Sequence, residues 1–387
     1  MSFGWTGDAL TTGAATPGAH DGMAAFALDT GRVALIRNHE LAPAPAFDKT
    51  LSYDAQAGGG TTTLIFDTKA GRLVESRASL SGTLRNCAGG PTPWGSWLTC
   101  EETTLGVGDH PLLTRNHGYV FEVPLQGLPS REPLTAMGRF VHEAVAVDPA
   151  SGIVYQTEDQ RRSGLYRFLP NTKARLADGG RLQMLAISGK PKFDTRINQS
   201  SGSRYAIHWV DIDNVERAHA DAALKDNAGV FSQGFERGGA IFARLEGAWY
   251  GGGRVFVTAT DGGNARMGQV WELDIARQQL RLVFESPGAG VLNMPDNLAV
   301  SPRGGLVLCE DGTANPCVHV LSQDGSISRF ARNTVVLERE RNGFVGDFTK
   351  SEFAGATFGP DGRWLFVNLQ SPGITLAITG PWERGIL

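Results

Sequence analysis

The sequence predicts an all-β chain that folds as a six-bladed β-propeller with a small helical insertion. Glycine is abundant, at 50 of 387 residues, which indicates many tight turns. A turn rich in Asp, Pro and Gly repeatedly leads into a short β-branched or aromatic run that ends at an acidic or polar residue. The ends of these runs mostly lie about 50–60 residues apart, a spacing typical of propeller blades that contain several strands.

The repeated runs are expected to be the innermost strands of the blades. In chain order they cover residues 33–40, 96–102, 153–159, 254–263, 305–312 and 363–370. They end at Glu40, Glu102, Asp159, Asp261, Asp311 and Gln370. The interval from Asp159 to Asp261 is about twice the others, so counting it as two gives about six blades.

Other segments suit the outer positions of the blades. They are residues 61–68, 118–125, 164–170, 269–275 and 280–286. Residues 211–226 are polar and rich in alanine, and we expect them to form the helical insertion. Because no linker or low-complexity tail is visible, residues 1–387 are expected to form a single propeller domain.

Composition limits the partners of the chain. The isoelectric point near 6.1 and the net charge of −4 give no reason to expect nucleic acid or an anionic membrane as a partner. No apolar run approaches the roughly 20 residues that a membrane helix needs. No secretory signal is visible at Met1, so the sequence leaves open an intracellular protein or a chain that begins after a removed leader. An anionic substrate would need positive charge from metal ions or from local arginines.

A propeller brings distant acidic residues together, because loops at one end of the channel converge from every blade. The candidates are Glu40, Glu101, Glu102, Glu143, Glu158, Asp159, Glu246, Asp261, Asp296, Glu310 and Asp311. Each one alone is better read as a solvated turn residue. Most of them recur at strand ends, and Glu143, Glu246 and Asp296 lie in unusual local contexts. The recurrence favours a metal site, because gathered carboxylates repel one another and calcium binds six to eight oxygen ligands.

The four cysteines form no C-x-x-C pair, which argues against a zinc ribbon. Disulfides Cys87–Cys100 and Cys309–Cys317 would be the simplest arrangement in an exported protein. Cys87 lies in a loop rich in turn residues, 86–95, and is half of a disulfide, a buried thiol or a thiolate ligand to a transition metal. His142, inside an apolar run, fits a core residue better than a ligand.

Five segments stand out along the chain: residues 37–40, 86–103, 139–159, 243–263 and 294–312. Together they resemble the PhoX-type alkaline phosphatase family. The resemblance runs from about Gly4 to Phe366, and the chain is similar to a short form of the family. It implies a propeller with a cluster of Fe³⁺ and Ca²⁺ at one channel end. It also implies hydrolysis of phosphate monoesters at alkaline pH by a periplasmic or secreted protein exported through the twin-arginine route.

Residue roles follow from the same resemblance. The implied metal ligands are Glu40, Cys87, Glu102, Glu143, Asp159, Glu246, Asp296 and Asp311. Arg244, in an R-x-E pattern with Glu246, would bind the substrate phosphate and serve catalysis. The choices of Glu102 over Glu101 and of Asp311 over Glu310 stay open. No serine or threonine nucleophile is expected, and Thr99 and Thr157 fit structural roles within strands.

The expected partner is a small phosphate ester bound by a monomer that contacts neither nucleic acid nor membrane. A phosphodiesterase or phosphotriesterase would be a close variant of the same site. A calcium-dependent propeller lactonase or esterase is the main alternative, and it would need no thiolate. A non-enzymatic propeller that binds proteins would need no convergence of acidic residues.

Overall fold

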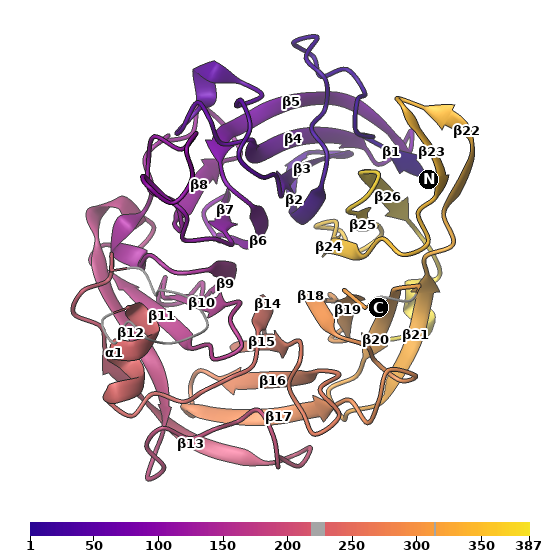
Figure 1. The fold of residues 1–387 in the computed structure, drawn as a ribbon. Helices are drawn as coiled ribbons and strands as arrows, with labels where there is room; N and C mark the ends of the chain where they lie inside the picture. Colours follow the sequence, from indigo (N-terminus) through magenta and orange to yellow (C-terminus); the bar gives the residue numbers. More distant parts are fainter. Residues whose placement is uncertain (218–228, 313–314) are drawn as a thin grey trace.

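A closed ring of six inner strands surrounds the centre of the molecule in the computed structural model, which describes residues 1–217, 229–312 and 315–387 (Figure 1). The inner strands are β2 (His20–Asp29), β6 (Asn86–Pro91), β9 (His142–Val147), β14 (Leu245–Gly251), β18 (Pro295–Val300) and β24 (Phe353–Phe358). Each packs against the next, and β24 packs against β2. The all-β propeller predicted from the sequence is therefore confirmed.

Each inner strand is followed outward by antiparallel partners. The second strands are β3 (Arg32–His39), β7 (Ser96–Glu101), β10 (Val154–Glu158), β15 (Arg254–Ala259), β19 (Leu306–Glu310) and β25 (Leu365–Leu369). The outer strands are β4 (Gly59–Asp67), β5 (Arg72–Thr83), β8 (Val120–Pro124), β11 (Leu165–Pro170), β12 (Gly180–Ile187), β13 (Arg204–Asp211), β16 (Gln269–Asp274), β17 (Gln279–Glu285), β20 (Cys317–Leu321), β21 (Ile327–Arg332) and β26 (Ile374–Ile378). A hairpin of β22 (Val336–Arg341) and β23 (Phe344–Asp347) lies outside the blades.

The two ends of the chain meet in one blade. The N-terminal strand β1 (Ser2–Phe3) pairs with β26, with Ser2 opposite Leu376. This pairing completes the blade of β24, β25 and β26 with a strand from the other end of the sequence. On the opposite side, β13 pairs with both β12 and β17 and so joins two blades into one continuous sheet.

The repeated runs form the second strand of each blade, so the expectation that they are innermost was wrong. Both faces of the second strands are buried between neighbouring blades, which accounts for their continuous apolar sequences. The inner strands instead carry small residues because their backbones approach closely. A Cβ on Gly22 would lie 2.7 Å from Ala88 Cα, and one on Gly355 would lie 2.4 Å from the Asp21 carbonyl oxygen.

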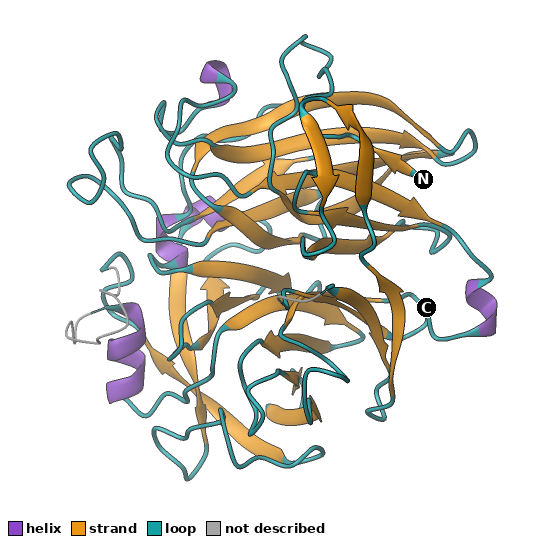
Figure 2. Ribbon diagram, turned by 45° about the vertical axis from the view of Figure 1, so that its right-hand side comes forward, coloured by secondary structure: helices purple, strands orange, loops and turns teal. Residues whose placement is uncertain are grey.

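Helices are few and lie at the periphery of the strands (Figure 2). The α-helix α1 (Val230–Glu236) and short 3₁₀ turns at Lys49–Leu51, Thr135–Met137, Leu176–Asp178 and Trp382–Arg384 are the helices of the described residues. The expected helix over 211–226 is not seen in its described part, because residues 211–217 end β13 and form turns. Its remaining residues lie outside the described part of the chain. None of the described helices is long and apolar enough to cross a membrane.

All four cysteines are free and buried. The candidate disulfides Cys87–Cys100 and Cys309–Cys317 are therefore absent. Cys100 and Cys309 pack in hydrophobic clusters between blades, so their thiols act as small apolar side chains. Cys87 lies apart from them, on inner strand β6.

Candidate metal centre

One position of the inner strands supplies most of the candidate ligands. It is the second residue of each strand, and we call this set the inner ring. Its members are Asp21 in β2, Cys87 in β6, Glu143 in β9, Glu246 in β14, Asp296 in β18 and Ala354 in β24. Because equivalent residues of all blades face the same channel end, five of the six blades place an acid or a thiol there.

A second position adds an outer ring, formed by the residue that directly follows each second strand. Its members are Glu40, Glu102, Asp159, Thr260, Asp311 and Gln370. Ligand atoms within 4.8 Å of one another form three overlapping groups: Asp21, Glu40 and Cys87; Cys87, Glu102 and Glu143; and Glu143, Glu246 and Asp296. The two rings therefore form one continuous cluster.

Acidic residues one position earlier do not belong to this cluster. The Glu101 carboxylate accepts hydrogen bonds from the backbone N–H groups of Leu84, Gly118 and Tyr119 at 2.8–3.1 Å. Glu158 accepts from the Gly164 N–H and the Tyr166 hydroxyl. In the same way, Glu310 accepts from the backbone of Asn293 and Cys317. These three glutamates fasten loops within their blades, which leaves Glu102, Asp159 and Asp311 in the outer ring.

Two arginines approach the cluster from equivalent positions. Arg85 and Arg244 each precede an inner strand and have left-handed backbones, with φ of +48° and +46°. Arg85 contacts Glu40 at 3.2 Å and Glu102 at 3.0 Å. Arg244 donates from Nε to Asp159 Oδ1 at 2.9 Å, and its Nη2 lies 2.5 Å from Glu246 Oε1. Burial alone would lower the pKa of Arg244, but the Glu246 and Asp159 carboxylates outweigh it and raise that pKa.

The carboxylates destabilise one another when ionised. Burial raises the pKa of Glu143 well above its usual value, and the neighbouring Asp296 and Glu102 carboxylates raise it further. The same causes raise the pKa of Asp21 and Glu246, and that of Asp296 to about 7. Among the described residues, neither oxygen of the fully buried Glu143 carboxylate has a hydrogen-bond partner. Such a group calls for a cation.

The Cys87 thiol lies at one end of the cluster, with Sγ 3.6 Å from Asp21 Oδ2. Burial raises the pKa of this thiol well above its usual value, and the carboxylates around it add to the shift. A bound cation would reverse this, because a coordinated thiol loses its proton. Cys87 is therefore inert as a free thiol and suited to metal coordination.

The second strands hold the ligand-bearing backbone in place. Asn38 donates to the Cys87 carbonyl oxygen at 3.0 Å. Asn368 donates in the same way to Asp21, at 2.6 Å. The hydroxyls of Thr157 and Thr258 donate to the carbonyl oxygens of Glu246 and Asp296, at 2.5 and 2.6 Å. Each of these bonds runs from one blade to the next, so the position of a ligand depends on two blades.

The structure brings the predicted site residues together, with Asp159 and Asp311 at the edge of the cluster. Asp311 contacts Glu352 and lies near Asp296. Asp261 lies one residue beyond the outer ring and lines a separate pocket. His142 packs on Phe140 with ring centroids 3.6 Å apart, and burial lowers its pKa to about 3, in agreement with a core residue.

Sequence reasoning missed Asp21, Arg85 and Glu352. The signal for Asp21 was present, because H-D-G at the start of β2 occupies the register of N-C-A, H-E-A and L-E-G in other inner strands. Arg85 directly precedes the N-C-A-G-G segment, as Arg244 precedes L-E-G. Glu352 precedes β24, where the ring residue is Ala354, and the sequence carries no repeated signal there.

Comparisons with known proteins agree with this geometry. The family model described as alkaline phosphatase PhoX matches residues 2–373. A search of curated protein sequences gave no match. The solved structure of Pseudomonas fluorescens PhoX in complex with vanadate, a transition-state analogue, covers 96% of this chain and 85% of its own, with a TM-score of 0.68 and 19% identity.

A gluconolactonase from Xanthomonas campestris is a more distant structural neighbour. It covers 94% of this chain and 87% of its own, with 12% identity and a TM-score of 0.44. That TM-score is too low to relate the two sites.

Proposed function

Because the chain belongs to the alkaline phosphatase PhoX family, it is a metal-dependent hydrolase of phosphate monoesters, and we propose that the inner and outer rings are its active centre. One observation carries the proposal: Glu143 is fully buried among acids, and neither of its carboxylate oxygens has a hydrogen-bond partner among the residues that the structure describes. A protein rarely retains a carboxylate in that state unless cations neutralise it.

The donor atoms suggest which metal each part of the cluster prefers. Two of the groups include the Cys87 sulfur, and soft thiolate ligands favour a transition metal. The third group, Glu143, Glu246 and Asp296, offers only oxygen, which suits a hard cation. We therefore assign Fe³⁺ to the Cys87 side and Ca²⁺ to the Glu246 side. Asp159 and Asp311 are proposed as further ligands at the edge.

The chain's own residues would bind and orient the ester. Arg244 holds Asp159 and Glu246 in the structure, and these carboxylates would turn toward cations when metal is bound. Its guanidinium would then be available to grip two phosphate oxygens as a fork, and Arg85 could do the same from the adjacent side. Bound metal ions would neutralise the phosphate and activate an oxygen nucleophile. Water would attack phosphorus, the ester P–O bond would break, and the alcohol would leave.

The substrate class is a small phosphate ester. The preference among mono-, di- and triesters depends on the loops around the rings rather than on the fold. We also propose that the protein works outside the cytoplasm as a monomer, with no nucleic acid or membrane partner.

Cys87→Ser tests the assignment of iron. We expect purified wild-type protein to contain iron and calcium, to show an iron–thiolate absorption band, and to hydrolyse p-nitrophenyl phosphate. The variant should lose the band and the iron, and its turnover should fall at least a hundredfold. Cys309→Ser is the matched control, because Cys309 is equally buried but lies in a hydrophobic cluster. Full turnover by Cys87→Ser would refute the assignment. A colourless, calcium-only preparation that opens lactones would support the lactonase alternative.

A further inference from the structure

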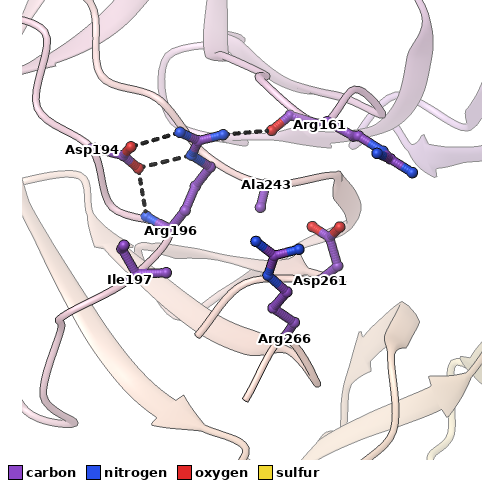
Figure 3. Close-up of a pocket in the computed structure, with 7 residues that line it drawn as sticks. All are labelled: Arg161, Asp194, Arg196, Ile197, Ala243, Asp261 and Arg266. Carbon is purple, nitrogen blue, oxygen red and sulfur yellow. Dashed lines mark hydrogen bonds and ion pairs between the residues drawn. The ribbon is translucent and has the colours of Figure 1, made fainter. Parts of the chain in front are cut away.

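A charged pocket lies beside the proposed active centre and is used by none of the steps above. Its volume is about 330 Å³. The residues that matter here are Arg161, Asp194, Arg196, Ala243, Asp261 and Arg266 (Figure 3). Unlike the two rings, which are acidic, this pocket has three arginines against two aspartates, a formal surplus of one positive charge.

The positive charge of the pocket is only partly neutralised by its own aspartates. Arg196 binds Asp194 through two bonds, from Nε at 2.9 Å and from Nη2 at 2.7 Å, so this pair is satisfied. Within the described part of the chain, the guanidinium groups of Arg161 and Arg266 form neither ion pairs nor hydrogen bonds. Both residues are exposed, and only the Asp261 carboxylate offsets them in the pocket. Figure 3 shows Asp261 and Arg266 directed toward the same space next to Ala243.

The walls of the pocket are held by hydrogen bonds. The Gly263 N–H donates to the Arg196 carbonyl oxygen at 2.8 Å, and the Asn198 N–H donates to Asn264 Oδ1 at 3.1 Å. Arg266 itself has a left-handed backbone, with φ of +54°, fixed by a bond from its N–H to the Gly263 carbonyl oxygen. The backbone that carries these side chains is therefore already ordered, which limits the entropy lost when a ligand binds.

The pocket adjoins the arginine proposed to grip the reacting phosphate. Ala243 lines the pocket, and the next residue, Arg244, contacts Asp159 and Glu246. Consecutive Cα atoms are about 3.8 Å apart, so the two binding regions are neighbours. The Arg244 N–H donates to the Gln160 carbonyl oxygen, and the Arg244 carbonyl oxygen accepts from the Thr260 N–H. These two bonds fix the position of the Arg244 backbone relative to the pocket. An ester held at Arg244 would reach the pocket by extending its leaving group past Ala243.

We propose that this pocket selects phosphate esters that carry a second anionic group, such as another phosphate or a carboxylate, a few bonds away from the reacting phosphate. The inference rests on the proposed function, because it places the reacting phosphate at Arg244. The uncompensated arginines would bind the second anion, and an uncharged leaving group would gain nothing from them.

The test compares two substrates whose leaving groups have similar reactivity: n-butyl phosphate and butane-1,4-diyl bisphosphate. Phosphate release gives kcat/KM for each. The bisphosphate carries two identical ester groups, so its kcat/KM would be twice that of n-butyl phosphate on statistical grounds alone. We expect the wild-type ratio of the two kcat/KM values to be on the order of ten or more. Arg266→Ala and Arg161→Ala should bring the ratio back toward two, whereas Asp261→Asn should increase it. Arg204→Ala is the matched control, because this exposed arginine of β13 lies on an outer strand, and it should leave the ratio unchanged.

A binding measurement separates this inference from the proposed function. Calorimetry with butane-1,4-bisphosphonate and n-butylphosphonate, which cannot be hydrolysed as esters, should show that the bisphosphonate binds more tightly by well over the statistical factor of two. In Arg266→Ala the difference should fall back toward that factor. If neither ester is hydrolysed, the proposed function fails, and the binding comparison still decides the pocket. Wild-type affinities for the two phosphonates that differ by no more than the statistical factor of two, or a wild-type kcat/KM ratio of two with active enzyme, would overturn the inference.

Discussion

A single step along a strand decides what each acidic residue does. Glu101 and Glu102 are neighbours, yet Glu101 binds three backbone N–H groups while Glu102 contacts Arg85 and faces Cys87 and Glu143. Successive side chains at the end of a strand point to opposite sides, so one fastens a loop and the other joins the cluster. The same division separates Glu158 from Asp159 and Glu310 from Asp311.

Thr157 tests how strongly the positioning hydroxyls support the cluster. Its hydroxyl donates to the Glu246 carbonyl oxygen and accepts from the Ala144 N–H. Thr157→Val keeps the shape but leaves both groups without a partner, so we expect kcat for p-nitrophenyl phosphate to fall on the order of tenfold. Thr61→Val removes one buried hydroxyl bond, to Ser79 on the outer strand β5, and should leave kcat unchanged. An unchanged kcat in Thr157→Val, with normal metal content, would show that the hydroxyl is not needed for positioning.

At the scale of elements, the inner strands combine ligands with close packing. The residue that follows an inner-ring ligand is small in most blades, including Gly22, Ala88, Ala144 and Gly247. The rings can be narrow only because neighbouring backbones touch at these positions. A sequence rich in glycine is thus a requirement of the cluster as well as of the turns.

Gly247→Ala measures this requirement. Its Cβ would lie 2.6 Å from the Asp296 carbonyl oxygen and 2.7 Å from the Leu298 nitrogen, both backbone atoms of the next blade. We expect the free energy of unfolding to fall by about 1–3 kcal/mol or more, because neither atom can yield as a flexible side chain would. Thermal unfolding monitored by circular dichroism provides the measurement. Gly288→Ala is the control, since a Cβ there meets no atom within 4 Å. Equal melting temperatures for the two variants would contradict the packing argument.

At the scale of the whole molecule, the ring is closed by the two ends of the chain, which pair in one blade. β1 and β26 are far apart in the sequence and complete one blade together. We propose on this basis that residues 1–387 act as one domain, because no blade can leave the ring without exposing the faces of two others. The cluster also depends on the whole ring, because its inner-ring ligands come from five different blades.

Metal removal should therefore destabilise the whole ring in a pH-dependent way. In metal-free protein the pKa values of Glu143, Glu246 and Asp21 are raised, and that of Asp296 is raised to about 7. Folded protein then keeps protons that the unfolded chain releases near pH 4, so its free energy of unfolding falls as pH rises from about 4 through 7. We expect the melting temperature in EDTA to drop steadily between pH 5 and pH 8.

Calcium is the control for this experiment. With excess Ca²⁺ the carboxylates are held ionised by the cation, so the fall should be much smaller. Activity lost in EDTA should return once both Ca²⁺ and iron are restored. If metal-free protein is as stable at pH 8 as at pH 5, repulsion between the ionised carboxylates of the cluster does not destabilise the fold.

The sequence by itself determined the propeller and the strand-ending acids, because turn residues and apolar runs are local signals that repeat with the blades. The ligand role of Cys87 came from the resemblance to the PhoX family and not from these repeats. Tertiary structure alone decided that the repeated runs are second strands. It also added Asp21 to the cluster and placed Arg85 and Glu352 beside it. It also chose Glu102 over Glu101. These outcomes depend on which blade faces which and on the side to which a side chain points. Contacts between residues far apart in the chain set both, and no local pattern encodes them.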